Sequence, residues 1–363
     1  MAAKAELISN SVQEMVLNGK EPPVKYFCKG NDVGFLDASV PLIDIPVVDL
    51  GLLTSPSTSA QELEKFHLAV SSRGCFQVVN HGMTSSFLDK IRDVSKRFFA
   101  LSMEDKQKYS READSIEGYG NDMILSDHQT IDWSDRLYLT FSPEDQRKIK
   151  FWPENPKDFR ETLNEYTMKL QEINEILLRA MAMSLNLEES SFLEQYGERP
   201  LVAARPDRIL GVKPHADASA ITFILQDKEV EGLQFLKDNQ WFRVPIIPHA
   251  LLINGGVEVE IMSNGIFKSP VHRVVTNTEK ERNTQAVFCI PESDKEINPA
   301  DGLISETRPS LYKKVKRGQT LCLGITTMEF HGVFSTHENS PVQISLAHRD
   351  DGCKPDKLHS NNM

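Results

Sequence analysis

The sequence has few cysteines, no long apolar run and no excess of positive charge. Its five cysteines, at positions 28, 75, 289, 322 and 353, form no Cys-x-x-Cys pair. An odd number of scattered cysteines favours reduced thiols in a cytoplasmic protein over a disulfide framework. No apolar run reaches the roughly 18 residues that a membrane-spanning helix needs, and the N-terminus lacks the apolar segment of a signal peptide. We therefore expect a cytoplasmic protein without a membrane partner.

The chain carries 41 Lys and Arg against 52 Asp and Glu, a formal net charge of −11. This balance argues against a nucleic-acid partner, which would require a basic face. The hydrophobic fraction of 40% is ordinary for a globular protein, and 363 residues can bury a sizeable core. We expect a small-molecule substrate and, without a signal for assembly, a monomer.

Three helices are predicted in the first half of the chain, at about 60–73, 84–101 and 159–186. The last has the clearest pattern, because apolar residues recur at spacings of three and four and leave the charged residues on the other side. Its apolar stripe consists of Leu163, Tyr166, Leu170, Ile173 and Leu177. A helix of this length could brace the back of a sheet.

From 209 to 290 the hydrophobic period changes to two. Short apolar segments, each bounded by Gly, Pro, Asn or Asp, follow one another without a helical pattern between them. They begin at Ile221, Gly232, Trp241, Ala250, Val257 and Gln285. Short strands at regular spacing indicate an antiparallel sandwich or a jelly roll, with 257–262 as one of the strands.

A possible metal site lies just before the strand at Ile221. In His215-Ala-Asp217 the two side chains are two residues apart, so an extended chain points both to one side. His272 lies in another strand-like segment that a sheet could bring opposite. Two imidazoles and one carboxylate form the facial ligand set of non-haem Fe(II) oxygenases, and the planar fork of Arg282 could bind a carboxylate.

A His-x-Asp motif alone is a weak signal, and the chain contains a second one, His348-Arg-Asp350. That motif lies in the unpatterned tail without a companion motif, so we interpret it as solvated surface. His81 and His249 are at strand–turn junctions, where structural roles are expected.

Several segments between about 40 and 316 together resemble the plant 2-oxoglutarate- and Fe(II)-dependent dioxygenases. The resemblance is to the branch of senescence-related dioxygenases, alkaloid O-demethylases and dioxygenase-like norcoclaurine synthases. The matching segments are Ile45-Pro-Val-Val-Asp-Leu, Gly74-Cys-Phe-Gln-Val-Val-Asn-His-Gly, Glu117-Gly-Tyr-Gly, Asp132-Trp133, His215-Ala-Asp217, Glu231-Gly-Leu-Gln, Ile261-Met-Ser-Asn-Gly and His272-Arg-Val.

The resemblance implies a mainly β fold, with a double-stranded β-helix (jelly roll) core and an N-terminal helical region. It implies a region 1–200 that includes the family's N-terminal domain at about 45–150, a jelly-roll domain at 201–316 and an atypical tail at 317–363. By motif match, His215, Asp217 and His272 would bind iron. Arg282 would bind the distal carboxylate of 2-oxoglutarate, with Thr284 in place of the family's Ser.

The implied reaction consumes 2-oxoglutarate and O2 at Fe(II), supported by ascorbate, and releases succinate and CO2. The oxidised substrate would be a small plant specialised metabolite or hormone, and hydroxylation, desaturation or O-demethylation could result. The protein would contribute positioning and a dry pocket rather than the redox chemistry.

Three departures from the family pattern bear on activity. About nine or ten residues, with the family's Asn-x-Tyr-Pro-Pro-Cys-Pro strand, are missing between Arg205 and Pro206. This predicts that a central strand is lost. It also predicts that the co-substrate contacts of that strand are lost, because no residue here matches the family residues that make them. The family's Asn-x-Gly-Asp turn is Asn254-Gly-Gly-Val257 here, and the C-terminal helix is replaced after Lys316. A retained intron or a misjoined exon would produce this pattern.

Two alternatives remain open beside the active oxygenase. One is a catalytically impaired member that binds metal but lacks part of the co-substrate pocket. The other is a norcoclaurine-synthase-like condensing enzyme, which would consume no O2.

Overall fold

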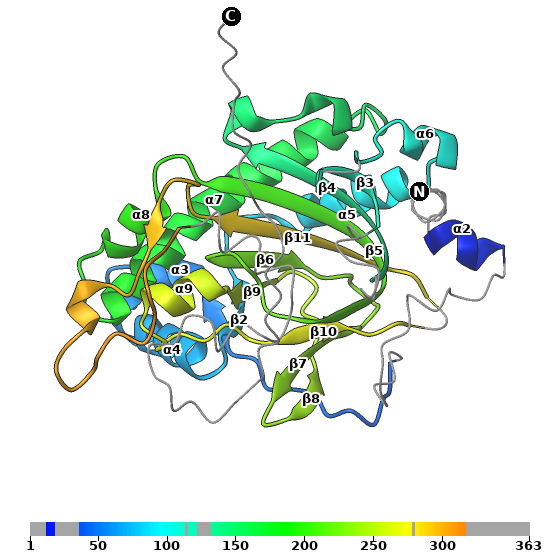
Figure 1. Ribbon diagram of the computed structural model, residues 1–363. Coiled ribbons are helices and arrows are strands. Elements are labelled where there is room, and N and C mark those ends of the chain that lie inside the picture. Colours follow the sequence, from blue (N-terminus) through cyan, green and yellow to red (C-terminus); the bar gives the residue numbers. More distant parts are fainter. Residues whose placement is uncertain (1–11, 19–35, 113–114, 122–131, 278–279, 317–363) are drawn as a thin grey trace, which may run out of the picture.

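The computed structural model describes residues 12–18, 36–112, 115–121, 132–277 and 280–316 (Figure 1). The tail from 317 and its His348-Arg-Asp350 motif lie outside the described residues. The helices are α2 (Val12–Leu17), α3 (Leu50–Thr54), α4 (Ser59–Ser72), α5 (Ser85–Phe99), α6 (Met103–Gln107), α7 (Phe159–Ser184), α8 (Ser191–Tyr196) and α9 (Val257–Met262), with short 3₁₀ turns η2 (Glu144–Gln146), η3 (Ile149–Phe151) and η4 (Asp301–Leu303). The strands are β1 (Val47–Asp49), β2 (Cys75–Val79), β3 (Gly118–Gly120), β4 (Trp133–Ser142), β5 (Leu201–His215), β6 (Ile221–Leu225), β7 (Leu233–Lys237), β8 (Gln240–Arg243), β9 (Leu251–Gly255), β10 (His272–Val274), β11 (Arg282–Ile290), β12 (Glu296–Ile297) and β13 (Val315–Lys316).

Eleven of these strands form one strongly curved sheet in the order β1-β2-β9-β6-β11-β5-β10-β7-β8, with β3 and β4 added alongside β5. Only the β1–β2 pair is parallel among the paired strands of the described ranges. The long strand β5 connects the two halves, because it pairs with β11 at its start and with β10 at its end (Figure 1). The predicted jelly-roll core with flanking helices is confirmed.

The predicted loss of a central strand is wrong. β5 runs without a break from Leu201 to His215, through the junction of Arg205 and Pro206. It pairs with β11 on one side and with β4 on the other over most of 202–209. The junction therefore leaves no row of unpaired backbone groups, because the residues beside it pair with β11 and with β4.

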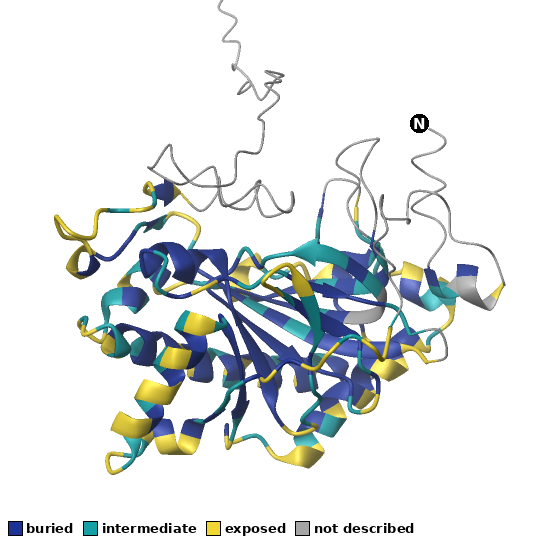
Figure 2. Cartoon of the chain, turned by 90° about the horizontal axis from the view of Figure 1, so that it is seen from below, coloured by how far each residue is buried: buried dark blue, intermediate teal, exposed yellow. Residues whose placement is uncertain are grey.

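Helices α4, α5 and α7 cover one face of the sheet. The stripe predicted for α7 is confirmed, since Leu163, Tyr166, Leu170, Ile173 and Leu177 are all buried in the main core. The helix lies behind the sheet, as expected of a brace (Figure 1). Figure 2 shows that exposed residues gather on the outward faces of the helices, whereas the strands between them are buried.

The segment 257–262 was predicted as a strand, and this prediction is wrong, since it forms helix α9. All six of its residues are buried, so its alternation of apolar and acidic residues does not mark one wet and one dry face. The helix begins where tertiary contacts satisfy its first backbone N–H groups: Val257 N donates to the carbonyl of Asp217, and Glu258 N donates to that of Ser219. These contacts override the local preference.

None of the helices in the described ranges is both long and apolar enough to cross a membrane.

Candidate functional site

Three side chains, two from paired strands and one from the loop after β5, converge at one point. His215 ends β5, and its backbone pairs with His272 at the start of β10. Asp217 follows two residues after β5, and its Oδ1 lies 3.7 Å from Nε2 of His215 and 3.8 Å from Nε2 of His272. One ligand atom from each residue lies within 4.8 Å of the others. Within the described part of the chain, no other group of three such residues meets this condition.

Backbone carbonyls fix the orientation of both imidazoles. Nδ1 of His215 lies 2.9 Å from the carbonyl oxygen of Lys213, and Nδ1 of His272 lies 3.1 Å from that of Pro270. A carbonyl can only accept, so each Nδ1 carries the proton and donates it. The Nε2 atoms therefore keep their lone pairs and face Asp217, which is the arrangement that metal-binding histidines require.

The charges of the three groups suit a cation. Burial lowers the pKa of His215 to about 3, and the neighbouring His272 adds to this effect, so the His215 imidazole is neutral at neutral pH. Burial alone would raise the pKa of Asp217, but His272 and His215, and then a hydrogen bond from Asn254, outweigh it. The pKa of Asp217 therefore lies below its ordinary value and the carboxylate is ionised, so an anionic oxygen donor lies beside the neutral imidazole of His215.

The triad lies at one wall of a small cavity of about 50 Å³. The predicted partners Arg282 and Thr284 line the same cavity from β11, so all five residues singled out from the sequence come together. Arg282 is 2% exposed and Thr284 4%. The Oγ1 atom of Thr284 has no hydrogen-bond partner among the described residues. A buried hydroxyl in that state needs a ligand or water atom to bond with.

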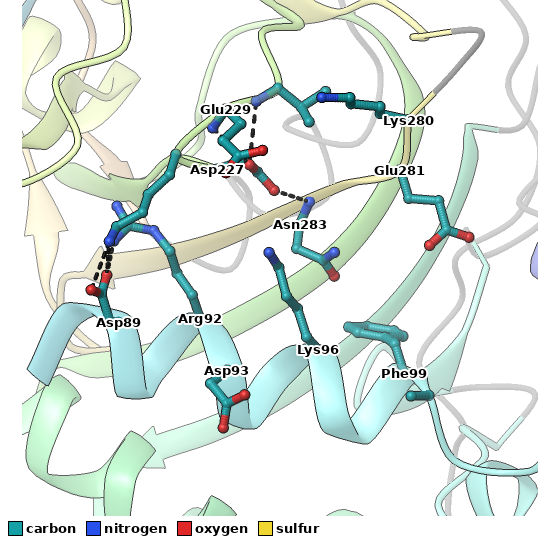
Figure 3. Close-up of a pocket in the computed structure, with 13 residues that line it drawn as sticks. Asp89, Arg92, Asp93, Lys96, Phe99, Asp227, Glu229, Lys280, Glu281 and Asn283 are labelled. Atoms are coloured by element: carbon teal, nitrogen blue, oxygen red, sulfur yellow. Dashed lines mark hydrogen bonds and ion pairs between the residues drawn. The ribbon is translucent and has the colours of Figure 1, made fainter. Parts of the chain in front are cut away.

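A larger cavity of about 610 Å³ lies on the other face of β11, against α5 (Figure 3). Adjacent residues of a strand point to opposite faces, so Asn283 faces this cavity while Arg282 and Thr284 face the triad. In Figure 3 the side chain of Asn283 points toward Lys96 of α5. This cavity contains none of the triad residues. Size alone would favour it as the active site, but the chemistry favours the small cavity.

The sequence did not identify three residues that support the triad. Nδ2 of Asn254 donates to Oδ2 of Asp217 over 3.2 Å, and the family turn at 254–257 was the available signal for it. Oδ1 of Asp132 accepts from the backbone N of Lys213 over 3.0 Å, which holds the residue whose carbonyl orients His215. Arg205 also lines the cavity, and no motif pointed to it.

Comparison with known families agrees with this geometry. Residues 45–155 match the family of non-haem dioxygenases in morphine synthesis (N-terminal domain). Residues 188–291 match the 2OG-Fe(II) oxygenase superfamily. Protein SRG1 of Arabidopsis thaliana is 35% identical over 327 residues, which is 86% of this chain and 90% of that protein. The chain belongs to the 2-oxoglutarate- and Fe(II)-dependent oxygenases.

Two further matches strengthen this placement. Codeine O-demethylase of Papaver somniferum is 36% identical over 84% of this chain and 88% of its own length. A crystal structure of JOX2 in complex with 2OG, Fe, and JA is 31% identical, covers 88% of this chain and 94% of that one, and superposes with a TM-score of 0.78. As a member of this family of oxygenases, the protein uses Fe(II) and 2-oxoglutarate. The two Nε2 atoms, the carboxylate and the unpartnered Thr284 hydroxyl fit these two groups.

Proposed function

We propose that His215, Asp217 and His272 bind Fe(II), and that Arg282 and Thr284 bind the distal carboxylate of 2-oxoglutarate. The observation that carries this proposal is the convergence of two Nε2 atoms and one carboxylate oxygen, with both Nδ1 atoms held by backbone carbonyls. Three protein ligands leave open positions on an octahedral metal, as a metal that must also bind co-substrate requires.

In this proposal the chain's own residues position and insulate the reacting groups. The carbonyls of Lys213 and Pro270 hold the imidazoles, and Asn254 holds the Asp217 carboxylate. Arg282 is a fixed cation at the buried end of the cavity, where a guanidinium can bind a carboxylate with two parallel hydrogen bonds. Iron and 2-oxoglutarate, when bound, would activate O2, which is the oxidant for a substrate C–H bond. The apolar walls from Val212 and Phe288 limit the access of water.

We further propose that the substrate is a small plant specialised metabolite or hormone, and the relatives named for O-demethylation of codeine and of a flavonoid support a small metabolite. The proposed state is a cytoplasmic monomer without a nucleic-acid or membrane partner, in keeping with the acidic composition. We also propose that the chain is divided into a region 1–200, a jelly-roll domain 201–316 and a separate tail from 317.

The direct test is turnover of 2-oxoglutarate to succinate by purified protein with Fe(II), O2 and ascorbate, without any added substrate. Such uncoupled turnover needs no knowledge of the substrate. His215→Ala and Asp217→Ala should abolish it. If either variant matches the parent, the assignment of the metal ligands fails.

A catalytically impaired member is the second candidate, and the size of the cavity favours it. About 50 Å³ is well below the roughly 300–1,000 Å³ of typical small-molecule sites. Anaerobic titration of the Fe(II)-loaded protein with 2-oxoglutarate separates the two, because a chelated complex gives a charge-transfer absorption band. If the protein gives no band, it is a catalytically impaired member. If it gives the band and also forms succinate, it is an active oxygenase.

A further inference from the structure

The cavity against α5 has the size of a ligand site and no role in the oxygenase reaction. Its volume of about 610 Å³ falls within the roughly 300–1,000 Å³ of typical small-molecule sites. Asn283 of β11 lies on one side, residues 89–100 of α5 line a second side, and the loop 227–230 after β6 lines a third (Figure 3). Phe99 adds an aromatic surface. The cavity therefore combines apolar surface with a few polar groups, as small-molecule sites do.

Hydrogen bonds fix the loop and the strand that form two of these sides. Oδ1 of Asp227 accepts from the backbone N of Glu229 over 3.0 Å and from that of Val230 over 3.3 Å. Oδ2 of the same carboxylate accepts from the backbone N of Asn283 over 3.1 Å. One carboxylate thus holds both elements in place before any ligand arrives, which lowers the ordering cost of binding.

Several charged side chains around the cavity already form ion pairs. These pairs are Asp89 with Arg92, Asp89 with Lys228, and Asp93 with Arg97. Two exposed residues of opposite charge, Glu229 and Lys280, also line the cavity. Together these groups give the cavity no strong preference for an ion of either sign.

Two side chains in the cavity are not engaged with the rest of the described protein. Asn283 is 8% exposed, and its amide oxygen Oδ1 is buried without a hydrogen-bond partner among the described residues. Lys96 is exposed, and it forms no hydrogen bond or ion pair with another residue of the cavity (Figure 3). The Asn283 side chain points toward Lys96 in the same view. A buried acceptor without a partner costs about 1–3 kcal/mol, so a ligand that donates to Oδ1 removes this cost.

The two side chains together define what such a ligand must offer. Oδ1 of Asn283 can only accept a hydrogen bond, whereas the ammonium of Lys96 can only donate one. An ionised carboxylate accepts from Lys96 but has no proton to donate to Oδ1. An organic ammonium donates to Oδ1 but is repelled by Lys96. A hydroxyl group has one donor and two acceptor lone pairs, so it can satisfy both.

We propose that this cavity is a second binding site and that its ligand is a neutral polyol, such as a sugar in its pyranose form. One hydroxyl donates to Oδ1 of Asn283 and accepts from Lys96. A further hydroxyl donates to the exposed carboxylate of Glu229, and the apolar face of the ring lies toward Phe99. The site contains no triad residue, so it goes beyond the proposed oxygenase function and does not depend on it.

The test is calorimetric titration of the full chain, loaded with Fe(II) under anaerobic conditions, with methyl α-D-glucopyranoside and with myo-inositol. Two matched compounds serve as controls. 2-Methoxytetrahydropyran has the ring without the hydroxyls, and cyclohexanecarboxylate has a ring with a carboxylate. At least one polyol should bind saturably with a dissociation constant below about 10 mM, and neither control compound should bind.

Four variants locate the binding. Lys96→Met and Asn283→Leu should each weaken it at least about tenfold, because each removes one partner of the bridging hydroxyl. Lys90→Met removes another exposed lysine of α5 that does not line the cavity, and it should keep the affinity of the parent. Asp217→Ala should also keep it, which separates this site from the iron site.

A second measurement needs no variant. Sulfosuccinimidyl acetate acetylates accessible lysines, and mass spectrometry gives the rate at each site. A bound polyol should slow acetylation of Lys96 and leave that of Lys90 unchanged. This result decides the matter even if Asn283→Leu fails to fold.

The outcomes distinguish this site from the oxygenase function. The proposal is overturned if neither polyol binds saturably, if Lys96→Met binds within twofold of the parent, or if a polyol protects Lys96 and Lys90 equally. Tighter binding of cyclohexanecarboxylate than of the polyols overturns the ligand class. A chain that binds a polyol through Lys96 but forms no succinate retains this site, while the proposed oxygenase function fails.

Discussion

Gly256 offers the sharpest test of how the fold holds Asp217. A Cβ atom built on Gly256 would overlap the carbonyl oxygen of Ser219, and would lie 2.6 Å from the carbonyl carbon and 2.8 Å from Oγ of that residue. The same loop accepts three backbone hydrogen bonds: Gly256 N donates to Ala220, Val257 N to Asp217 and Glu258 N to Ser219. Gly256→Ala must therefore push the start of α9 away from the loop that carries Asp217.

The expected cost follows from these contacts. Overpacking of this kind costs about 1–3 kcal/mol, and weakening one or two backbone hydrogen bonds adds about 1 kcal/mol each. We expect a total of about 2–5 kcal/mol, which for a chain of this size lowers the unfolding midpoint by roughly 3–7 °C. Because the carboxylate moves with the loop, Fe(II) affinity should fall at least about tenfold.

The assay is thermal unfolding of the metal-free protein together with anaerobic Fe(II) titration. Gly51→Ala in α3 is the matched control, since its new Cβ would come no closer than 3.3 Å to Oδ1 of Asp49. In a helix this change gains up to about 1 kcal/mol, and a small shift of the capping Asp49 side chain offsets part of it, so we expect a net change below about 1 kcal/mol in either direction. A Gly256→Ala variant that keeps both the midpoint and the Fe(II) affinity of the parent would refute the reasoning.

Three other predictions follow from the described residues. A chelator should lower the unfolding midpoint of Fe(II)-loaded protein, because ligand at 100 times its dissociation constant stabilises by about 2.7 kcal/mol, and Asp217→Ala should show no such difference. Burial raises the pKa of Cys75 and Cys289 to about 12, so site-resolved mass spectrometry should find both unalkylated by iodoacetamide until the protein unfolds; rapid labelling of either in native protein would contradict this. Burial lowers the pKa of His81, whose Nε2 donates to the carbonyl of His249. The unfolded state therefore binds more protons than the folded state, so the free energy of unfolding falls as the pH drops below about 6.5. His81→Gln should make urea unfolding less dependent on pH between 6.5 and 5.

The parts of the fold that repeat a simple period could be predicted from the sequence. The stripe of α7 buries one face of that helix, so the pattern and the structure have the same cause. Strand β11 is buried on both faces, and the short apolar segment that begins at Gln285 was enough to predict it. Helix α9 could not be predicted in this way, because it is buried on every side and its start depends on contacts with the loop after Asp217.

The candidate site likewise contains residues that could be predicted from the sequence and residues that could not. The triad and Arg282 belong to short sequence motifs, so they could be predicted from the sequence. The structure places all four in one cavity. Arg205 belongs to no motif. Its position depends on the register between β5 and β11, which is information that neighbouring residues in the sequence do not carry. Asn254 stands between these cases, since its turn was noticed but its contact with Asp217 was not.

The alternation of β11 has a consequence for how this enzyme can change over evolutionary time. Arg282 and Thr284 face the triad, while Asn283 between them faces the cavity against α5. Inserting or deleting one residue within the strand would exchange the two faces and turn the arginine out of the site, whereas a change of two residues would preserve them. Insertions or deletions in β11 that keep the protein active should therefore involve an even number of residues. Because this one strand forms a wall of each cavity, a change in the strand affects both cavities.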